Sequence, residues 1–266
     1  MAAPNPLRQQ QARTRLAELF AYPAAVFVVH YSCQSFFQGE KLGSPRVTAI
    51  GVSNLQSGQT FSYSVQQIAD MRRLTPMRVL GSMDAIEREL LAGFFTFLRM
   101  NANARFLHWN MRDATFGFAA IEHRVRVLGG EPFVLHEASK YDLARLLIDI
   151  FGTDYIENPK LENLARLNAL SLSGYLDGAA EAEAFEHGRY QAVLQSNLRK
   201  VGLIAAYATM AHDRTLRTEA SWWTRHGGRV GEVTRQLWNY PVLRLGFSVV
   251  GALSFGLSVL RLLGVI

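Results

Sequence analysis

Apolar residues in the first half of the chain form two kinds of pattern, short continuous runs and longer stretches with helical spacing. The run from Ala24 to Val29 is rich in β-branched residues and is typical of a buried strand. Two further runs flank turn residues at 56–58 and predict a tight hairpin. We expect strands at 24–29, 46–53, 60–65 and 105–108, and helices at 9–20, 85–100 and 116–128.

The chain becomes helical after residue 140. Apolar positions recur there at intervals of three and four residues, and no internal repeat is present. Strands followed by helices in this order predict an α/β domain, in which helices cover a mixed sheet. We expect the later helices at 142–151, 159–167, 181–189 and 191–212.

The segment from Val242 to Ile266 is almost entirely apolar, with charges only at Arg244 and Arg261. Its uninterrupted part, 245–260, would rise about 24 Å as a helix, and the flanking residues extend it toward the ~30 Å core of a bilayer. The two arginines could reach the headgroups with their long stems. We therefore expect a C-terminal transmembrane helix. A buried helix pair or an interfacial helix is the alternative.

The stretch before this segment is basic and aromatic. Tryptophan and tyrosine are favoured at membrane interfaces, and positive charge on the N-terminal side of a span places that side in the cytosol. We expect a single-pass membrane protein whose main domain is cytoplasmic. The small residues Ser248, Ala252 and Gly256 would permit a homo-oligomer through the C-terminal helix. The predicted organisation is an N-terminal helix (1–23), an α/β domain (24–212), a juxtamembrane linker (213–241) and the anchor (242–266).

The formal net charge of +6 indicates an acidic partner, either nucleic acid or an anionic lipid surface, or a solvated basic face without a partner. The juxtamembrane linker holds five arginines against three carboxylates, a net +2 of the +6, which weakens the argument from net charge to nucleic acid. Cys33 is the single cysteine, which excludes an internal disulfide and a zinc site built on paired cysteines. It is either a nucleophile beside His30 or, as we expect, a packed thiol.

Ionisable residues concentrate near the expected strand ends, where open α/β sheets place their ligand clefts. A general base or a one-metal site using His30 and Asp113 is one interpretation. The other is that His108 caps a strand and that 122–124 begins a solvated helix face. The residues of this group are His30, His108, Asp113, Glu122 and His123.

The segment HWNMRD, at residues 108–113, is the most unusual in the chain. Trp109 and Arg112 could stack on a base and pair with a phosphate, or Trp109 could simply pack on the sheet. Two acidic groups are expected to be solvated helix faces. They are Asp84, Glu87 and Glu89 in the first group, and Glu181, Glu183 and Glu186 in the second.

Four segments follow one another in an order that resembles the RNase H-like 3′–5′ exonucleases of the DEDD type. They are AVFVVHYSCQSF, FLHWNMRDATFGF, KLENLARLNALSL and SNLRKVGLIAAYATMA. The resemblance covers about residues 24–212. It implies an RNase H-like mixed sheet, and a site where four carboxylates hold two Mg²⁺ ions about 4 Å apart.

The chain departs from this family at its metal-binding positions. His30 and Ser32 stand where the first strand of the family carries Asp and Glu. Ser196 and Lys200 match the last motif, so a cation replaces a carboxylate there. Most of the charge that would bind two Mg²⁺ ions is therefore missing.

The second motif departs as well. Asn110 is retained, but the Asp position of the family falls on Ala114, with Asp113 one residue earlier. What the resemblance still implies is the fold and a nucleotide- or nucleic-acid-binding groove. The residues expected to line that groove are His30, Ser32, His108, Trp109, Asn110, Arg112, Ser196 and Lys200.

Two functions follow from these patterns. The first is a membrane-tethered, catalytically inactive exonuclease-like domain that binds nucleic acid or a nucleotide, or serves as a scaffold. The alternative is a membrane-associated phosphodiesterase or nuclease with a divergent Mg²⁺ or Mn²⁺ site built from His30, Asn110 and Asp113. A third hypothesis is a protein-interaction module without a small-molecule site.

Overall fold

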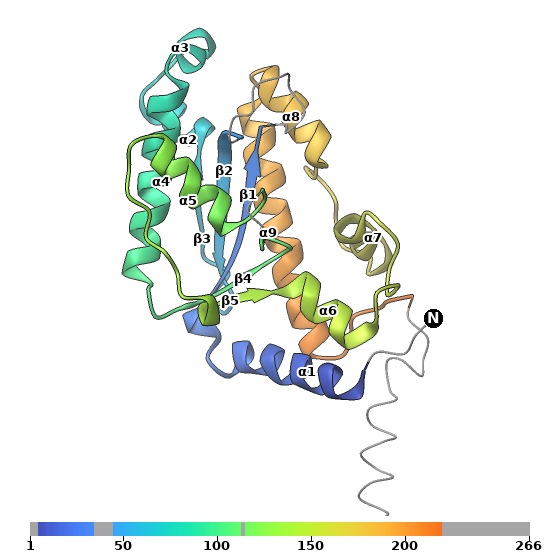
Figure 1. Cartoon of the computed structure of the whole chain (residues 1–266). Helices are drawn as coiled ribbons and strands as arrows, with labels where there is room; N and C mark the ends of the chain where they lie inside the picture. Colours follow the sequence, from blue (N-terminus) through green and yellow to red (C-terminus); the bar gives the residue numbers. More distant parts are fainter. Residues whose placement is uncertain (1–4, 35–44, 113–114, 220–266) are drawn as a thin grey trace, which may run out of the picture. The chain divides into compact units, whose positions relative to one another are not determined.

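A five-stranded mixed sheet forms the centre of the protein, as a computed structural model shows (Figure 1). The structure describes residues 5–34, 45–112 and 115–219. The strand order is β3-β2-β1-β4-β5, with β1 antiparallel to β2, β2 antiparallel to β3, and β1, β4 and β5 parallel. The strands are β1 (Val26–Cys33), β2 (Val47–Asn54), β3 (Thr60–Ser64), β4 (Arg105–His108) and β5 (Lys140–Asp142).

Helices cover both faces of this sheet. The long α9 (Tyr190–His212) packs across β1 and β2 on one face, while α4 (Met83–Met100) packs against β2 and β3. The other helices are α1 (Pro6–Ala21), α2 (Val65–Met71), α3 (Pro76–Gly81), α5 (Phe118–Val127), α6 (Leu143–Phe151), α7 (Lys160–Leu167) and α8 (Gly178–Glu186). The predicted α/β class, a mixed sheet flanked by helices, is confirmed.

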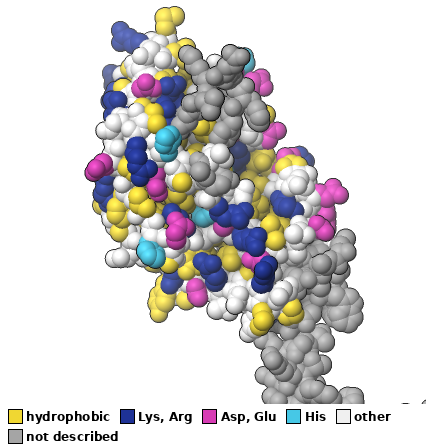
Figure 2. Space-filling view, viewed as in Figure 1, with side chains coloured by type: hydrophobic (Ala, Val, Ile, Leu, Met, Phe, Trp, Pro, Cys, Tyr) yellow, Lys and Arg dark blue, Asp and Glu magenta, His cyan; other side chains and the backbone are white. Residues whose placement is uncertain are grey.

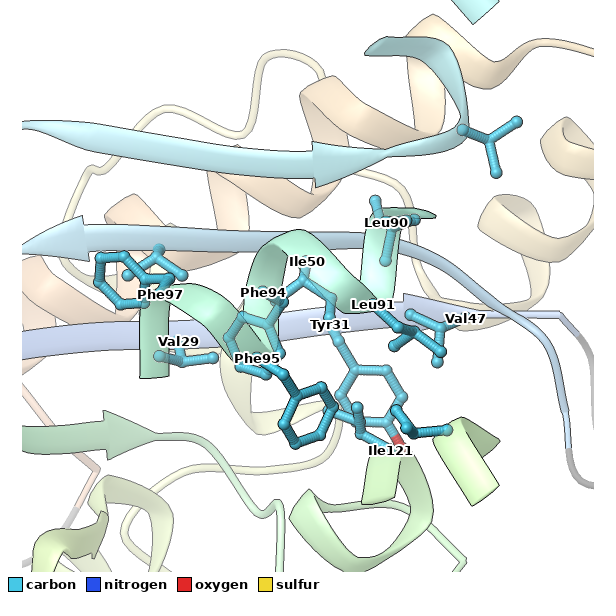
Figure 3. Packing of buried hydrophobic residues seen from close by; sticks show 14 of the residues in the cluster. Val29, Tyr31, Val47, Ile50, Leu90, Leu91, Phe94, Phe95, Phe97 and Ile121 are labelled. Carbon is cyan, nitrogen blue, oxygen red and sulfur yellow. The ribbon is translucent and has the colours of Figure 1, made fainter. Parts of the chain in front are cut away.

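The hydrophobic core lies between the sheet and α4. Three phenylalanines of α4 point toward Val29 and Tyr31 of β1 (Figure 3), and all of these side chains are buried. Because β1 has helices on both faces, its first four residues, 26–29, form a continuous apolar run rather than an alternating pattern. The three phenylalanines are Phe94, Phe95 and Phe97.

The predicted elements are present with shifted ends, and some elements were missed. Residues Pro23–Ala25 form a short 3₁₀ turn, so the first strand begins at Val26 and continues to Cys33. Val65 begins α2 rather than ending a strand. The sequence pattern predicted neither α2, α3 nor β5, because these elements are too short to show a clear hydrophobic period.

The expectation of a solvated acidic face on 84–89 is wrong for Glu87, which is fully buried. The Arg124 guanidinium donates to both carboxylate oxygens of Glu87, each at 2.7 Å, and the Val47 amide donates to Oε1 at 2.8 Å. Arg124, also expected on a solvated face, is therefore buried as well. This bidentate pair ties α4 to α5 and to the start of β2.

No helix within 5–34, 45–112 or 115–219 is long and apolar enough to cross a membrane. The predicted anchor at 242–266 and most of the juxtamembrane linker lie outside the described residues. Both stay predictions.

Candidate functional site

His30 and Ser32 are two residues apart on β1 and therefore face the same side of the sheet, toward α9. The Asn197 side-chain amide of α9 donates to Ser32 Oγ at 3.1 Å and to the backbone oxygen of His30 at 3.3 Å. Gly51 of β2 lies opposite His30, and a Cβ atom there would come within 2.4 Å of Asn197 Oδ1. The missing side chain of Gly51 thus allows α9 to approach the sheet closely.

Lys200 lies one helical turn beyond Asn197 and is buried. Its ammonium nitrogen is 2.7 Å from Glu181 Oε1 of α8, and the two side chains are only 6% and 5% exposed. The same ammonium lies over the Tyr175 ring, 5.4 Å from its centroid. Glu181 was expected on a solvated helix face; that expectation is wrong, because α8 packs this residue against α9.

His30 is uncharged at neutral pH. Burial, together with the positive charge of Lys200 and the neighbouring His108, lowers the pKa of His30 from 6.5 to about 3. Its Nδ1 atom is buried without a hydrogen-bond partner among the described residues. Burial and the Glu181 carboxylate raise the pKa of the nearby Cys33 thiol to about 12, so it carries no appreciable thiolate.

Ser196 belongs to a different contact. Its hydroxyl accepts a hydrogen bond from the Leu176 amide at 2.9 Å and donates to the Leu176 carbonyl at 3.1 Å. The side chain therefore holds the loop before α8 against α9. This role depends on a residue twenty positions away, which the local sequence pattern does not reveal.

A second polar group follows the end of β4, on the other face of the sheet. His108 is in register with Val29, whose side chain lies in the core beneath α4, and the His108 ring contacts the Phe118 ring edge-on. Alternation along the strands places His30 on the opposite face. Trp109, next to His108, lies with its ring centroid 6.1 Å from that of Tyr207 of α9.

Asp142 organises this second group, although the sequence analysis did not select it. Its Oδ1 accepts from the Asn110 amide at 3.0 Å, and its Oδ2 lies 2.5 Å from Arg112 Nε. Arg112 also donates to the Asn110 side-chain oxygen at 2.8 Å. Asp142 is the N-cap of α6 and accepts from the Ala144 amide. An aspartate immediately before an apolar helix is the signal that could have identified it.

The structure thus divides the expected binding residues between two places. It brings His30, Ser32 and Lys200 together on the α9 face, and His108, Asn110 and Arg112 together at the end of β4. The candidate Asp113 lies outside the described residues.

The residues on the α9 face do not fit a two-metal centre. Within the described ranges, no group of three or more His, Cys, Asp or Glu side chains is placed to hold a metal ion. The carboxylate that the described part contributes here is Glu181, and the Lys200 ammonium already neutralises it. Comparison of the chain with protein-family models, curated proteins and solved structures gives no match.

Proposed function

We infer that residues 24–212 form a catalytically inactive exonuclease-like domain of RNase H-like type, which binds a nucleotide or nucleic acid and is held at a membrane by the C-terminal segment. The order of a long first strand, a hairpin, a helix, a parallel strand and a closing helix supports the family resemblance. So does the packing of α9 across β1, which puts Lys200 beside His30.

The observation that carries this proposal is the buried ion pair between Lys200 and Glu181. It occupies the place where the resemblance puts metal-binding carboxylates. The two charges of this pair neutralise each other, so neither offers an uncompensated negative charge to a divalent cation. The neutral His30 adds no negative charge either. Metal-dependent hydrolysis therefore has no electrostatic support among the described residues.

The test is a nuclease assay on the purified full chain in a neutral detergent. Labelled single-stranded DNA and RNA are incubated with Mg²⁺ or Mn²⁺, and the products are separated on a gel. We expect no cleavage above that of a reaction without protein. Metal-dependent cleavage that disappears in both His30→Ala and Asp113→Ala would overturn the proposal and establish the divergent phosphodiesterase instead. A thermal melt of each variant shows that loss of cleavage is not loss of folding.

A further inference from the structure

A pocket of about 610 Å³ opens beside the second polar group, away from the Lys200–Glu181 pair. It is lined by residues of α1, α5, β5 and α6 and by the segment that follows β4. Lysine and arginine side chains gather over β5, α6 and α1 on the face shown in Figure 2. The volume is within the range of about 300–1,000 Å³ that is typical of small-molecule sites.

The charge of this pocket is unbalanced. Five cationic and three carboxylate side chains are among the described residues that line it. Each carboxylate is paired with a cation of the same lining, so two cations are in excess. The pairs are Arg112 with Asp142 at 2.5 Å, Lys140 with Glu137 at 2.6 Å and Arg145 with Asp149 at 3.5 Å.

The two excess cations are Arg8 and Arg15, and both are exposed on α1. Neither has a carboxylate partner within the described part of the chain. They are seven residues apart, so they share one face of the helix about 10 Å from each other. The Arg15 guanidinium lies over the Tyr141 ring at 5.0 Å, which positions it without neutralising it. Gln11, between them on the same face, also lines the pocket.

His108 contributes a buried donor to the lining. It is only 2% exposed, and its Nδ1 accepts a hydrogen bond from the Met111 amide at 3.2 Å. Burial is the largest of the effects that lower its pKa to about 4, so the ring is neutral and its proton lies on Nε2. With its proton on Nε2, the neutral ring can donate one hydrogen bond to a ligand in the pocket, whose lining includes His108.

We propose that this pocket binds a small organic molecule that carries two phosphate groups. Guanidinium groups bind phosphate oxygens through two parallel hydrogen bonds, and Arg8 and Arg15 offer two such groups along one helix face. Apolar lining by Met111, Phe118 and Leu146 suits the organic part of the ligand. The proposal deepens the binding role assigned to the domain and rests on that role, but it does not depend on the absence of catalysis.

Isothermal titration calorimetry of the full chain, at low salt and neutral pH, tests it. The probes are ADP, fructose 1,6-bisphosphate, soluble inositol 1,4-bisphosphate, pyrophosphate and inorganic phosphate. We expect at least one organic bisphosphate to bind at a single site, and more tightly than inorganic phosphate or pyrophosphate. Preference for ADP identifies a nucleotide as the ligand, and preference for the inositol compound identifies a lipid headgroup.

The variant Arg8→Ala/Arg15→Ala should raise the dissociation constant at least tenfold. The matched control is Arg73→Ala/Arg78→Ala, which removes two exposed charges from residues outside the pocket and should change the constant less than twofold. Absence of binding to every probe overturns the proposal. So does equal loss in the control, or binding of the inorganic ions as tight as that of the organic ones.

The nuclease assay separates the two proposals. Metal-dependent cleavage together with intact bisphosphate binding would refute the inactive-domain proposal and leave the pocket standing. Absence of cleavage together with absence of binding would refute the pocket alone. Since Arg8 and Arg15 are exposed, thermal melts should show that the double variant folds like the wild type.

Discussion

Replacing Lys200 by Met should be among the most destabilising single changes in the domain. Lys200 and Glu181 are both almost completely buried and lie 2.7 Å apart. Removing the ammonium leaves the Glu181 carboxylate without its charge partner in a region of low dielectric constant. The expected loss in the free energy of unfolding is about 3–5 kcal/mol. For a domain of this size that corresponds to a fall in melting temperature on the order of 10 °C.

The double variant Lys200→Met/Glu181→Leu separates the energy of the pair from the cost of breaking it. With both charges replaced by apolar side chains of similar volume, we expect a stability within about 1 kcal/mol of the wild type, or higher. The control is Arg166→Met, which breaks the largely exposed i,i+4 pair with Glu162 and should cost no more than about 0.5 kcal/mol.

Urea denaturation of the full chain, followed by circular dichroism, measures all three variants. A loss below about 1 kcal/mol in Lys200→Met would show that water or another group solvates Glu181, and the argument against a metal centre would then lose its basis. A double variant less stable than the single one would also contradict the reasoning.

Two other measurements test the description of the site. In the folded chain the pKa values of His30 and His108 are about 3 and about 4, against an ordinary 6.5, so the unfolded chain binds more protons between these limits. The free energy of unfolding should therefore be highest above pH 6.5 and should fall as the pH drops toward 4. The expected fall is up to about 1.4 kcal/mol per pH unit for each histidine. Urea midpoints that do not change between pH 7 and pH 5 would contradict the burial of both rings. Gly51→Ala should lower the free energy of unfolding by about 1–3 kcal/mol, because the new Cβ meets Asn197 Oδ1. In the control Gly81→Ala the new Cβ enters open space, so its stability should be close to that of the wild type. Equal melting temperatures for the two variants would show that α9 can shift away from the sheet.

The local elements of this protein can be predicted from its sequence because their hydrophobic periods are clear. The strand at 105–108 is found at its predicted residues, and the long helix α9 begins one residue before its predicted start. The turn at 56–58 likewise joins the two strands expected on either side of it. These signals arise from neighbouring residues, so no knowledge of the rest of the chain is needed to read them.

The tertiary structure alone decided where the polar side chains lie. Residues 140–142 form a strand only because β4 offers them a partner, and a three-residue segment has no period of its own. Glu87 and Glu181 resemble solvated helix residues until Arg124 and Lys200 are brought to them from distant parts of the chain. A buried charge is stable only with such a partner, and the partner is specified by packing rather than by sequence spacing.

The division of the candidate site has the same origin. Sequence reasoning placed His30 and His108 at neighbouring strand ends. The strands β1 and β4 are neighbours, but β1 continues beyond His30 to Cys33, so only His108 lies at a strand end. Their side chains nevertheless lie on opposite faces, because the register aligns His108 with Val29 and a shift of one residue reverses the direction of a strand side chain. One face therefore carries the Lys200–Glu181 pair, and the other carries His108. Residue types and their order were readable from the sequence, but strand register determined which of them meet.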